Sequence, residues 1–229
     1  MNRKTSLSDY VKSGIVQVPL NERQFIKEAH EKKQIVLHHT GSGNNVTGDI
    51  NWWNKTKERI ATCIVIHRNG TIYQVFSSRY WAYHLGTGVS TNNIPWKFKK
   101  NGSLYDRHSI GIELDSWGYL TKKGDKYYSY ANVEIPEDHV EIYYKPHRGH
   151  YYYERYTDAQ IESAIQLIQY WRAYYGIPVN YNEDIFDLCT RALEMQPGVY
   201  THNSYVSANL RNDIHPQPTL IKRLEEINE

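Results

Sequence analysis

Two adjacent histidines, His38 and His39, end a short apolar run and are the first residues of the chain suited to chemistry. The run Gln34-Ile-Val-Leu-His-His-Thr40 has the composition of a buried strand, and Gly41 ends it. Successive side chains of a strand point to opposite faces, so only one histidine can face a given site. A histidine at a strand end is more often satisfied by ordinary hydrogen bonds than by a metal ion. The pair alone therefore does not establish a site.

Glu113 is a second candidate, because it is a carboxylate inside the apolar strand Ser109-Ile-Gly-Ile-Glu-Leu114. Alternation places Ile110 and Ile112 on one face and Gly111 and Glu113 on the other. The glycine two residues before Glu113 leaves room around the carboxylate. Glu113 could therefore act as a general base, and the alternative is a solvent-facing residue on a half-exposed strand.

Zinc is the metal to consider, and a catalytic zinc ion needs three ligands from His, Asp, Glu or Cys together with a position for water. The chain has no His-Glu-x-x-His and no Cys-x-x-Cys motif, so distant segments would have to assemble the site. His139, His147 and His150 form another group, but their flanking Pro146 and Gly149 indicate an exposed loop rather than a metal site. Spacing alone cannot decide whether a zinc site exists.

The elements that position these residues alternate between strands and helices. Asn-Gly between the runs Cys63–His67 and Thr71–Phe76 predicts a hairpin. Thr157 and Gln160 form a capping box that begins a helix ending near Gly176. Further helices are predicted over residues 184–194 and 218–227, and Asp49 is predicted to cap a helical turn containing Trp53.

This order predicts an α/β fold with a single domain, in which a central mixed β-sheet is covered by helices. Residues 1–33 are interpreted as an N-terminal extension and residues 34–229 as the domain. The tyrosine-rich stretch 115–156 is interpreted as an irregular insertion that elaborates one face. The chain shows no repeats and no linker that would separate two domains.

Net charge, aromatic content and cysteine count limit which kinds of ligand and which cellular setting are expected. The net charge of +2 over 229 residues is too small for nucleic-acid binding by bulk electrostatics. The 21 tyrosines and six tryptophans suit surfaces that bind sugars or peptides, and they suit plain core filling equally well. Cys63 and Cys189 are too few for a disulfide framework and are interpreted as small buried residues. The basic N-terminus lacks an apolar segment after it, so we expect synthesis in a cytoplasm without a signal peptide, and no membrane span.

Four stretches together resemble the zinc-dependent N-acetylmuramoyl-L-alanine amidase family, which includes the peptidoglycan recognition proteins and many phage endolysins. A weaker fifth match is His202 followed by Arg211-Asn-Asp213. The four stretches are Ile35-Val-Leu-His-His-Thr40, Ile66-His-Arg-Asn-Gly-Thr-Ile-Tyr-Gln74, Trp81-Ala-Tyr-His-Leu-Gly86 and Ser109-Ile-Gly-Ile-Glu-Leu114. The resemblance runs from about residue 34 to 227 and is interrupted by the insertion.

The resemblance implies a zinc site with three ligands, His38, His202 and Asp213, although His215 is a nearby rival to Asp213. It implies that Glu113 is the general base and that Arg211 stands where a lysine usually stabilises the oxyanion. His84 matches a histidine that contacts substrate, and Trp53 is a further candidate for the substrate groove, which Trp52 could line as well. The tyrosine used by another branch of the family is replaced here by Thr62, so that role is absent.

The implied activity is hydrolysis of the amide between the muramic acid lactyl group and L-alanine of peptidoglycan, with Zn²⁺ as cofactor. The favoured setting is a bacteriolytic phage endolysin that acts on the cell wall as a monomer. Two alternatives are a cytoplasmic amidase that recycles muropeptides and a non-catalytic peptidoglycan-binding module of the same fold. A fold relative with an unrelated role would be preferred if His202 and Asp213 did not converge on His38.

Overall fold

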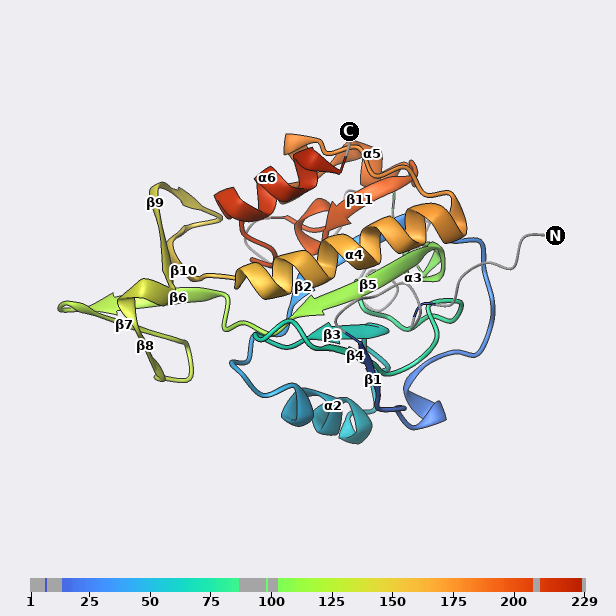
Figure 1. Ribbon diagram of the computed structural model, residues 1–229, viewed down its shortest axis with the longest axis horizontal. Coiled ribbons are helices and arrows are strands. Elements are labelled where there is room, and N and C mark those ends of the chain that lie inside the picture. The colour runs from blue at the N-terminus through green and yellow to red at the C-terminus, as the bar shows by residue number, and fades with distance from the viewer. Residues whose placement is uncertain (1–6, 8–13, 87–97, 99–102, 208–210, 228–229) are drawn as a thin grey trace.

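A six-stranded mixed β-sheet forms the centre of the molecule (Figure 1), with strand order β1-β4-β3-β5-β2-β11. The computed structural model describes residues 7, 14–86, 98, 103–207 and 211–227. Strands β3, β5, β2 and β11 run parallel to one another, and β4 is antiparallel to β3. The strands are β1 (Ile15–Gln17), β2 (Gln34–His39), β3 (Ile64–Ile66), β4 (Ile72–Gln74), β5 (Ser109–Leu114) and β11 (Gly198–Thr201).

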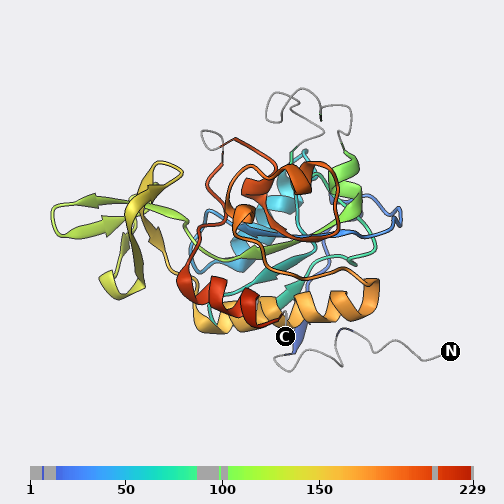
Figure 2. The ribbon, with the colours of Figure 1, turned by 90° about the horizontal axis from the view of Figure 1, so that it is seen from above.

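Helices cover this sheet, which confirms the predicted α/β class. The α-helices are α2 (Val46–Lys55), α3 (Leu104–His108), α4 (Asp158–Tyr175), α5 (Thr190–Leu193) and α6 (Pro218–Glu226). Short 3₁₀ helices are η1 (Glu22–Gln24), η4 (Glu137–His139), η5 (Glu183–Phe186) and η6 (His202–Ser204). In Figures 1 and 2, α4 and α6 lie together along one face of the sheet.

Helix ends follow the sequence in one place and depart from it in two. The capping box of Thr157 and Gln160 begins α4, and Gly176 ends it with a φ of 74°. The helix predicted over 184–194 is wrong, because η5 and α5 are separate short pieces. The cap predicted at Asp49 is also wrong: the side chain of Asn45 accepts the hydrogen bond from Gly48 N that begins α2.

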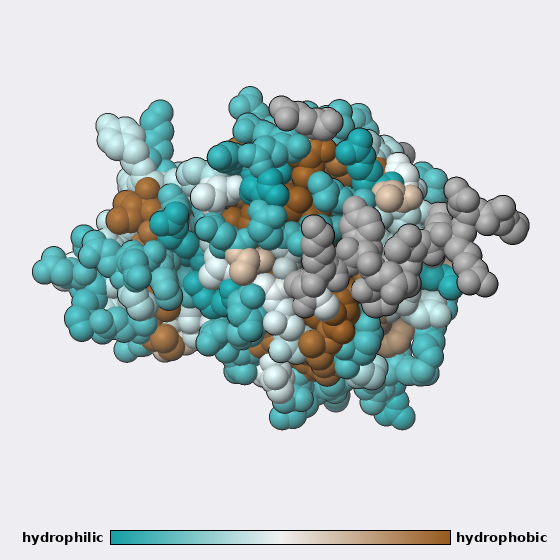
Figure 3. Space-filling model, viewed as in Figure 1, coloured by the Kyte–Doolittle hydropathy of each residue, from teal (hydrophilic) through white to brown (hydrophobic). Residues whose placement is uncertain are grey.

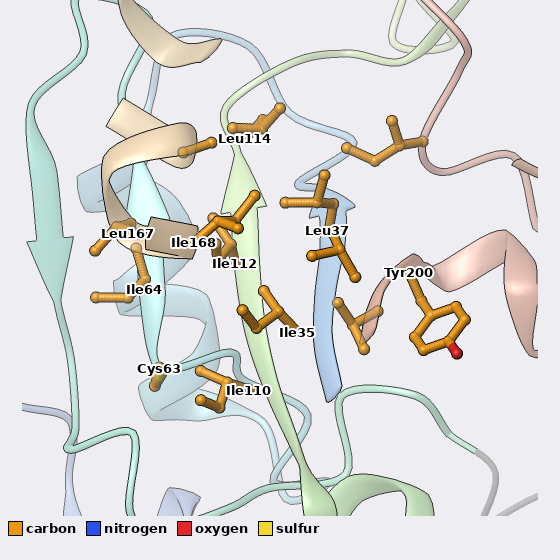
Figure 4. Packing of buried hydrophobic residues seen from close by; sticks show 14 of the residues in the cluster. Ile35, Leu37, Cys63, Ile64, Ile110, Ile112, Leu114, Leu167, Ile168 and Tyr200 are labelled. Atoms are coloured by element: carbon orange, nitrogen blue, oxygen red, sulfur yellow. The ribbon is translucent and has the colours of Figure 1, made fainter. Parts of the chain in front are cut away.

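Alternation along β2 and β5 separates the core from the face that carries chemistry. Ile35 pairs with Ile110 and Leu37 with Ile112, so these side chains share one face of the sheet. Figure 4 shows Leu167 and Ile168 of α4 packed beside them. Val36, His38, Gly111 and Glu113 consequently point to the other face. The apolar core under α4 thus fixes which side chains of β2 and β5 are available to a site.

Residues 119–154 form a second sheet, called here the inserted sheet, so the expectation of an irregular insertion over 115–156 is wrong. Its order is β8-β7-β6-β10-β9, all antiparallel, and it stands to one side of the central sheet in Figures 1 and 2. Its strands are β6 (Tyr119–Lys123), β7 (Lys126–Tyr128), β8 (Glu134–Ile135), β9 (Val140–His147) and β10 (His150–Glu154). A small core of Leu120, Tyr127, Ile135 and Val140 stabilises it.

The N-terminal residues that the structure describes belong to the central sheet rather than to a separate extension. Strand β1 pairs with β4, and Leu20 and Phe25 are buried in the main core. A boundary at residue 33 therefore does not separate them from the domain. Residues 1–6, 8–13, 87–97 and 99–102 lie outside the described residues.

No helix among the residues that the structure describes has the length and apolar character needed to cross a membrane. On the face seen in Figure 3, hydrophobic residues form separate patches between hydrophilic ones. Cys63 and Cys189 are both free and buried, as predicted.

Candidate active site

Three parallel strands end at the same edge of the central sheet and bring candidate residues together there. His38 of β2 lies in register with Glu113 of β5, so both side chains point to the same face. Thr201, the last residue of β11, pairs with Leu37, which places His202 beside His38. The carboxyl ends of parallel strands are where open α/β sheets bind their ligands. This edge is the candidate active site.

His38, His202 and Asp213 converge in a tight triangle, and all three are buried. Nδ1 of His38 lies 3.1 Å from Nδ1 of His202, and Oδ2 of Asp213 lies 3.2 Å from the latter and 3.5 Å from the former. The backbone ties Asp213 to this place, because Asn203 N donates to Asp213 O over 3.0 Å. His202 and Asp213 therefore converge on His38, as the family resemblance requires.

Hydrogen bonds on the far side of each imidazole assign the ring hydrogens. Nε2 of His202 donates to the carbonyl of Leu85 over 3.3 Å, because a carbonyl can only accept. Ser109 Oγ donates to Tyr105 O over 2.7 Å and thus accepts from His84 Nε2 over 2.8 Å. Nδ1 of His84 must then accept the hydrogen of His38 Nε2, 2.9 Å away. With these hydrogens on Nε2, each ligand histidine in its neutral form has a bare Nδ1 that faces the triangle.

The triangle fits a metal ion of the zinc class. Two bare nitrogens 3.1 Å apart, with a carboxylate beside them, repel one another unless a cation lies between them. Ligands at zinc distances around a tetrahedral ion would be spaced by about 3.3 Å, and the three observed separations lie close to that value. Two histidines and one carboxylate, with a further position open to the pocket, are the donor set of a catalytic zinc site.

Local electrostatics keep one of these ligands, His38, in the state that a cation needs. Burial lowers the pKa of His38 to about 4, so the ring is neutral at pH 7. The Nδ1 of this neutral ring carries no hydrogen and is free to bind a cation.

The other candidate histidines have different partners. Nδ1 of His215 contacts the hydroxyl of Tyr143 at 2.7 Å, and its Nε2 donates to Glu154 O, so His215 does not join the triangle. His39 points to the opposite face of the sheet and pairs with the hydroxyl of Tyr156 at 3.0 Å. His139, His147 and His150 form no group with metal-binding geometry among the residues described.

Glu113 and Arg211 line one pocket with the triangle. The pocket has a volume of about 880 Å³, which is within the range of small-molecule sites. Oε2 of Glu113 is buried and has no hydrogen-bond partner among the residues that the structure describes. Burial, and after it the charges of Asp213 and Asp49, raises the pKa of Glu113 well above its ordinary value. A carboxylate with a raised pKa beside a metal site is suited to accept and return a proton.

Two residues expected to bind substrate, His84 and Trp53, also line the pocket, but little of either is exposed. Both nitrogens of His84 are already engaged, and Gly111 makes room for its ring. A Cβ at position 111 would lie 3.1 Å from His84 Nδ1 and 2.6 Å from Thr62 Cγ2. Trp53 packs in the main core, whereas its neighbour Trp52 is 54% exposed and offers its ring to the pocket.

Sequence reasoning missed several lining residues, among them Asp49 and Tyr130. The sequence predicts Asp49 only as a helix cap, whereas in the structure its Oδ1 accepts a hydrogen bond from Ser42 Oγ over 2.6 Å. Tyr130 lies in the turn between β7 and β8 of the inserted sheet. The signal that predicts a hairpin in this segment is a glycine-containing turn between two tyrosine-containing runs, as in residues 119–128.

Comparisons with known proteins agree with this geometry. The family model described as N-acetylmuramoyl-L-alanine amidase matches residues 28–218. The solved structure of PlyL matches with a TM-score of 0.53 at 14% identity, covering 92% of this chain and 96% of that chain. Staphylococcus aureus hydrolase AmiA, solved in complex with its ligand, matches with a TM-score of 0.51 at 14% identity, covering 93% of this chain and 84% of that one. At these identities the structural matches show a shared fold. A search of curated proteins gave no match.

Proposed function

Because the chain belongs to the N-acetylmuramoyl-L-alanine amidase family, we propose that it is a zinc-dependent enzyme that hydrolyses the amide between the muramic acid lactyl group and L-alanine. The observation that carries this proposal is the convergence of His38, His202 and Asp213 beside Glu113. That arrangement supplies a metal site and a proton acceptor in one pocket. A module that only binds peptidoglycan would need neither.

His38, His202 and Asp213 would hold the ion through Nδ1, Nδ1 and Oδ2. When bound, zinc supplies Lewis acidity, which makes water a nucleophile near neutral pH and polarises the scissile carbonyl. Glu113 accepts a proton from the attacking water and returns it to the departing L-alanine nitrogen, which leaves as an amine. The raised pKa of Glu113 makes its carboxylate a stronger proton acceptor toward the attacking water than an ordinary carboxylate would be.

Arg211 contributes positive charge at the pocket rim. It is exposed, and its guanidinium offers hydrogen-bond donors that can stabilise the developing oxyanion. Its backbone carbonyl accepts a hydrogen bond from Arg148 Nη1 over 2.8 Å, which steadies the segment on which it lies.

The test is mass spectrometry of a muramoyl-L-alanyl peptide incubated with the zinc-loaded protein. The proposal expects two products, the N-acetylmuramic acid with its free lactyl carboxylate and the peptide with a free L-alanine amine. Chelation with excess EDTA should abolish the cleavage, and zinc should restore it. Cleavage at another bond, or none by the zinc-loaded protein, would overturn the proposal.

We propose a phage endolysin as the biological setting, acting on the cell wall. Exposed aromatic residues at the pocket, Trp52 and Tyr130, support this choice, because a site that takes a polymer must be open at its rim. The discriminating measurement compares intact sacculi with soluble muropeptides. An endolysin releases soluble material from sacculi, whereas activity on the soluble fragments alone would indicate a recycling amidase.

A further inference from the structure

The inserted sheet contributes directly to the pocket, although it stands apart from the central sheet. Its Tyr130, in the turn between β7 and β8, lines the same pocket as His38, Glu113 and Asp213. Tyr130 is 65% exposed. Trp52, from the last turn of α2, lines that pocket as well and is 54% exposed. Two large and exposed aromatic residues therefore line the pocket together with the catalytic residues.

Hydrogen bonds within the turn hold Tyr130 in place. Ser129 N donates to Val133 O over 2.9 Å, and Val133 N donates to Ser129 Oγ over 3.1 Å. The ring of Tyr130 meets the indole of Trp117 edge to face, with centroids 5.6 Å apart. An aromatic residue held in this way loses little conformational freedom when it binds a ligand.

Trp117 connects this arrangement to the active-site loop. Its indole lies against Gly43, where a Cβ would come within 1.9 Å of Nε1, so that only glycine permits the contact. Trp117 N donates to Glu154 Oε2 over 2.7 Å, and Glu154 Oε1 forms a buried ion pair with Arg68 at 3.1 Å. Tyr130 is thus positioned relative to the loop after β2, and hence to His38.

We propose that Tyr130 and Trp52 form a saccharide platform, on which a pyranose ring of the glycan strand stacks while its lactyl amide lies at Glu113. This inference rests on the proposed function, since the sugar is the part of that substrate attached through the lactyl group. The stem peptide fits the rings less well. Its carboxylates favour the cationic side chains of the pocket, Lys57 and Arg211, whereas the ring neighbour of Tyr130 is the uncharged Trp117.

The chemistry of stacking favours a sugar. A tyrosine or tryptophan ring presents an apolar face and keeps a polar edge in water, which matches a pyranose with C–H bonds on its faces and hydroxyls around its rim. Ser42 and Asp49 line the same pocket and could form hydrogen bonds with the hydroxyls of the sugar. The inserted sheet would therefore select the glycan-bearing form of the substrate and take no part in bond cleavage.

The experiment compares kcat/KM on two substrates, a disaccharide muramoyl tripeptide and a D-lactyl tripeptide that lacks the sugars. We expect Tyr130→Ala and Trp52→Ala each to lose about 2- to 12-fold on the first substrate and nothing on the second. Tyr130→Phe, which keeps the ring, should match wild type. Tyr144→Ala is the control on the same sheet, because Tyr144 is 97% exposed and does not line the pocket.

Equal losses on both substrates would show that the rings contact the peptide, and unchanged values on both would show no contact, so either result overturns the platform. A wild-type protein that cleaves neither substrate would refute the proposed function instead. Binding of the free disaccharide, followed by NMR, decides the platform independently of cleavage. The two alanine variants should bind it more weakly than wild type and Tyr144→Ala, and equal binding or no binding by all four would contradict the inference.

Discussion

Nε2 of His38 donates a hydrogen bond to Nδ1 of His84 over 2.9 Å, and this contact leaves Nδ1 of His38 bare toward His202 and Asp213. This series of hydrogen bonds continues from Nε2 of His84 to Oγ of Ser109 and ends at the backbone carbonyl of Tyr105. A metal ligand is thereby held in one tautomer and one orientation by a neighbour that need not touch the ion. His84 is a positioning residue in this arrangement.

We expect His84→Ala to weaken zinc binding by about 10- to 100-fold, because His38 loses the acceptor that fixes its tautomer. Competition with a chromophoric chelator measures the zinc dissociation constant without reference to activity. Ser109→Ala removes the next link only and should have a smaller effect in the same direction. Unchanged zinc affinity in His84→Ala would show that His38 is oriented by packing alone.

Glu113→Gln should keep the zinc affinity of the wild type and lose about 10²- to 10⁴-fold in kcat, because the amide cannot accept the proton of the attacking water. Zinc content by elemental analysis and turnover on a muramoyl peptide give the two values on the same sample. Retention of full turnover would remove Glu113 from the role of general base. Loss of zinc would mean that the substitution disturbs the metal site instead.

Asp49→Asn should move the acidic limb of the pH–rate profile to lower pH. The charge of Asp49 raises the pKa of Glu113, after burial and Asp213, so removing that charge makes Glu113 easier to deprotonate. The catalytically competent carboxylate then persists to a lower pH. Profiles of kcat/KM for wild type, Asp49→Asn and the distant exposed variant Asp125→Asn check this, and a shift to higher pH would have the wrong sign.

Arg148→Ala should weaken zinc binding although Arg148 lies outside the triangle. From the turn between β9 and β10, its guanidinium donates to the carbonyls of Asn203, Val206 and Arg211 at 2.8–2.9 Å. It thus holds the segment between the second and third ligands, and its removal leaves three carbonyls without this donor. Lys145→Ala, an exposed residue of β9, is the control. Identical zinc affinity in both variants would contradict this bracing role.

The sequence predicts the parts of this site that lie on regular strands better than the parts that lie on loops. Strand alternation identifies Glu113 as a residue on the non-core face, and the apolar run before His38 marks β2. Neither pattern gives the register that pairs His38 with Glu113, because register depends on how strands from distant parts of the chain pack. The choice of Asp213 over His215 likewise depends on tertiary contacts, since spacing places both residues near His202.

The tyrosine content of residues 115–156 does not predict the inserted sheet, because tyrosine is found in strands, cores and binding surfaces alike. Its hairpin turns contain glycines at positive φ, Gly124 and Gly149, at 60° and 86°. The sequence is sufficient to predict these turns, because each glycine lies between runs of residues that favour strands. The sequence does not predict that Tyr130 reaches the pocket, because that contact depends on how Trp117 packs against Gly43.

The most direct test of the account is a zinc-edge anomalous difference map from a crystal of the zinc-loaded protein. We expect one strong peak, bound by Nδ1 of His38, Nδ1 of His202 and Oδ2 of Asp213, with Nε2 of His38 still hydrogen-bonded to His84. A peak ligated by His84 or His215 in place of any of the three, or no peak at this edge of the sheet, would contradict it.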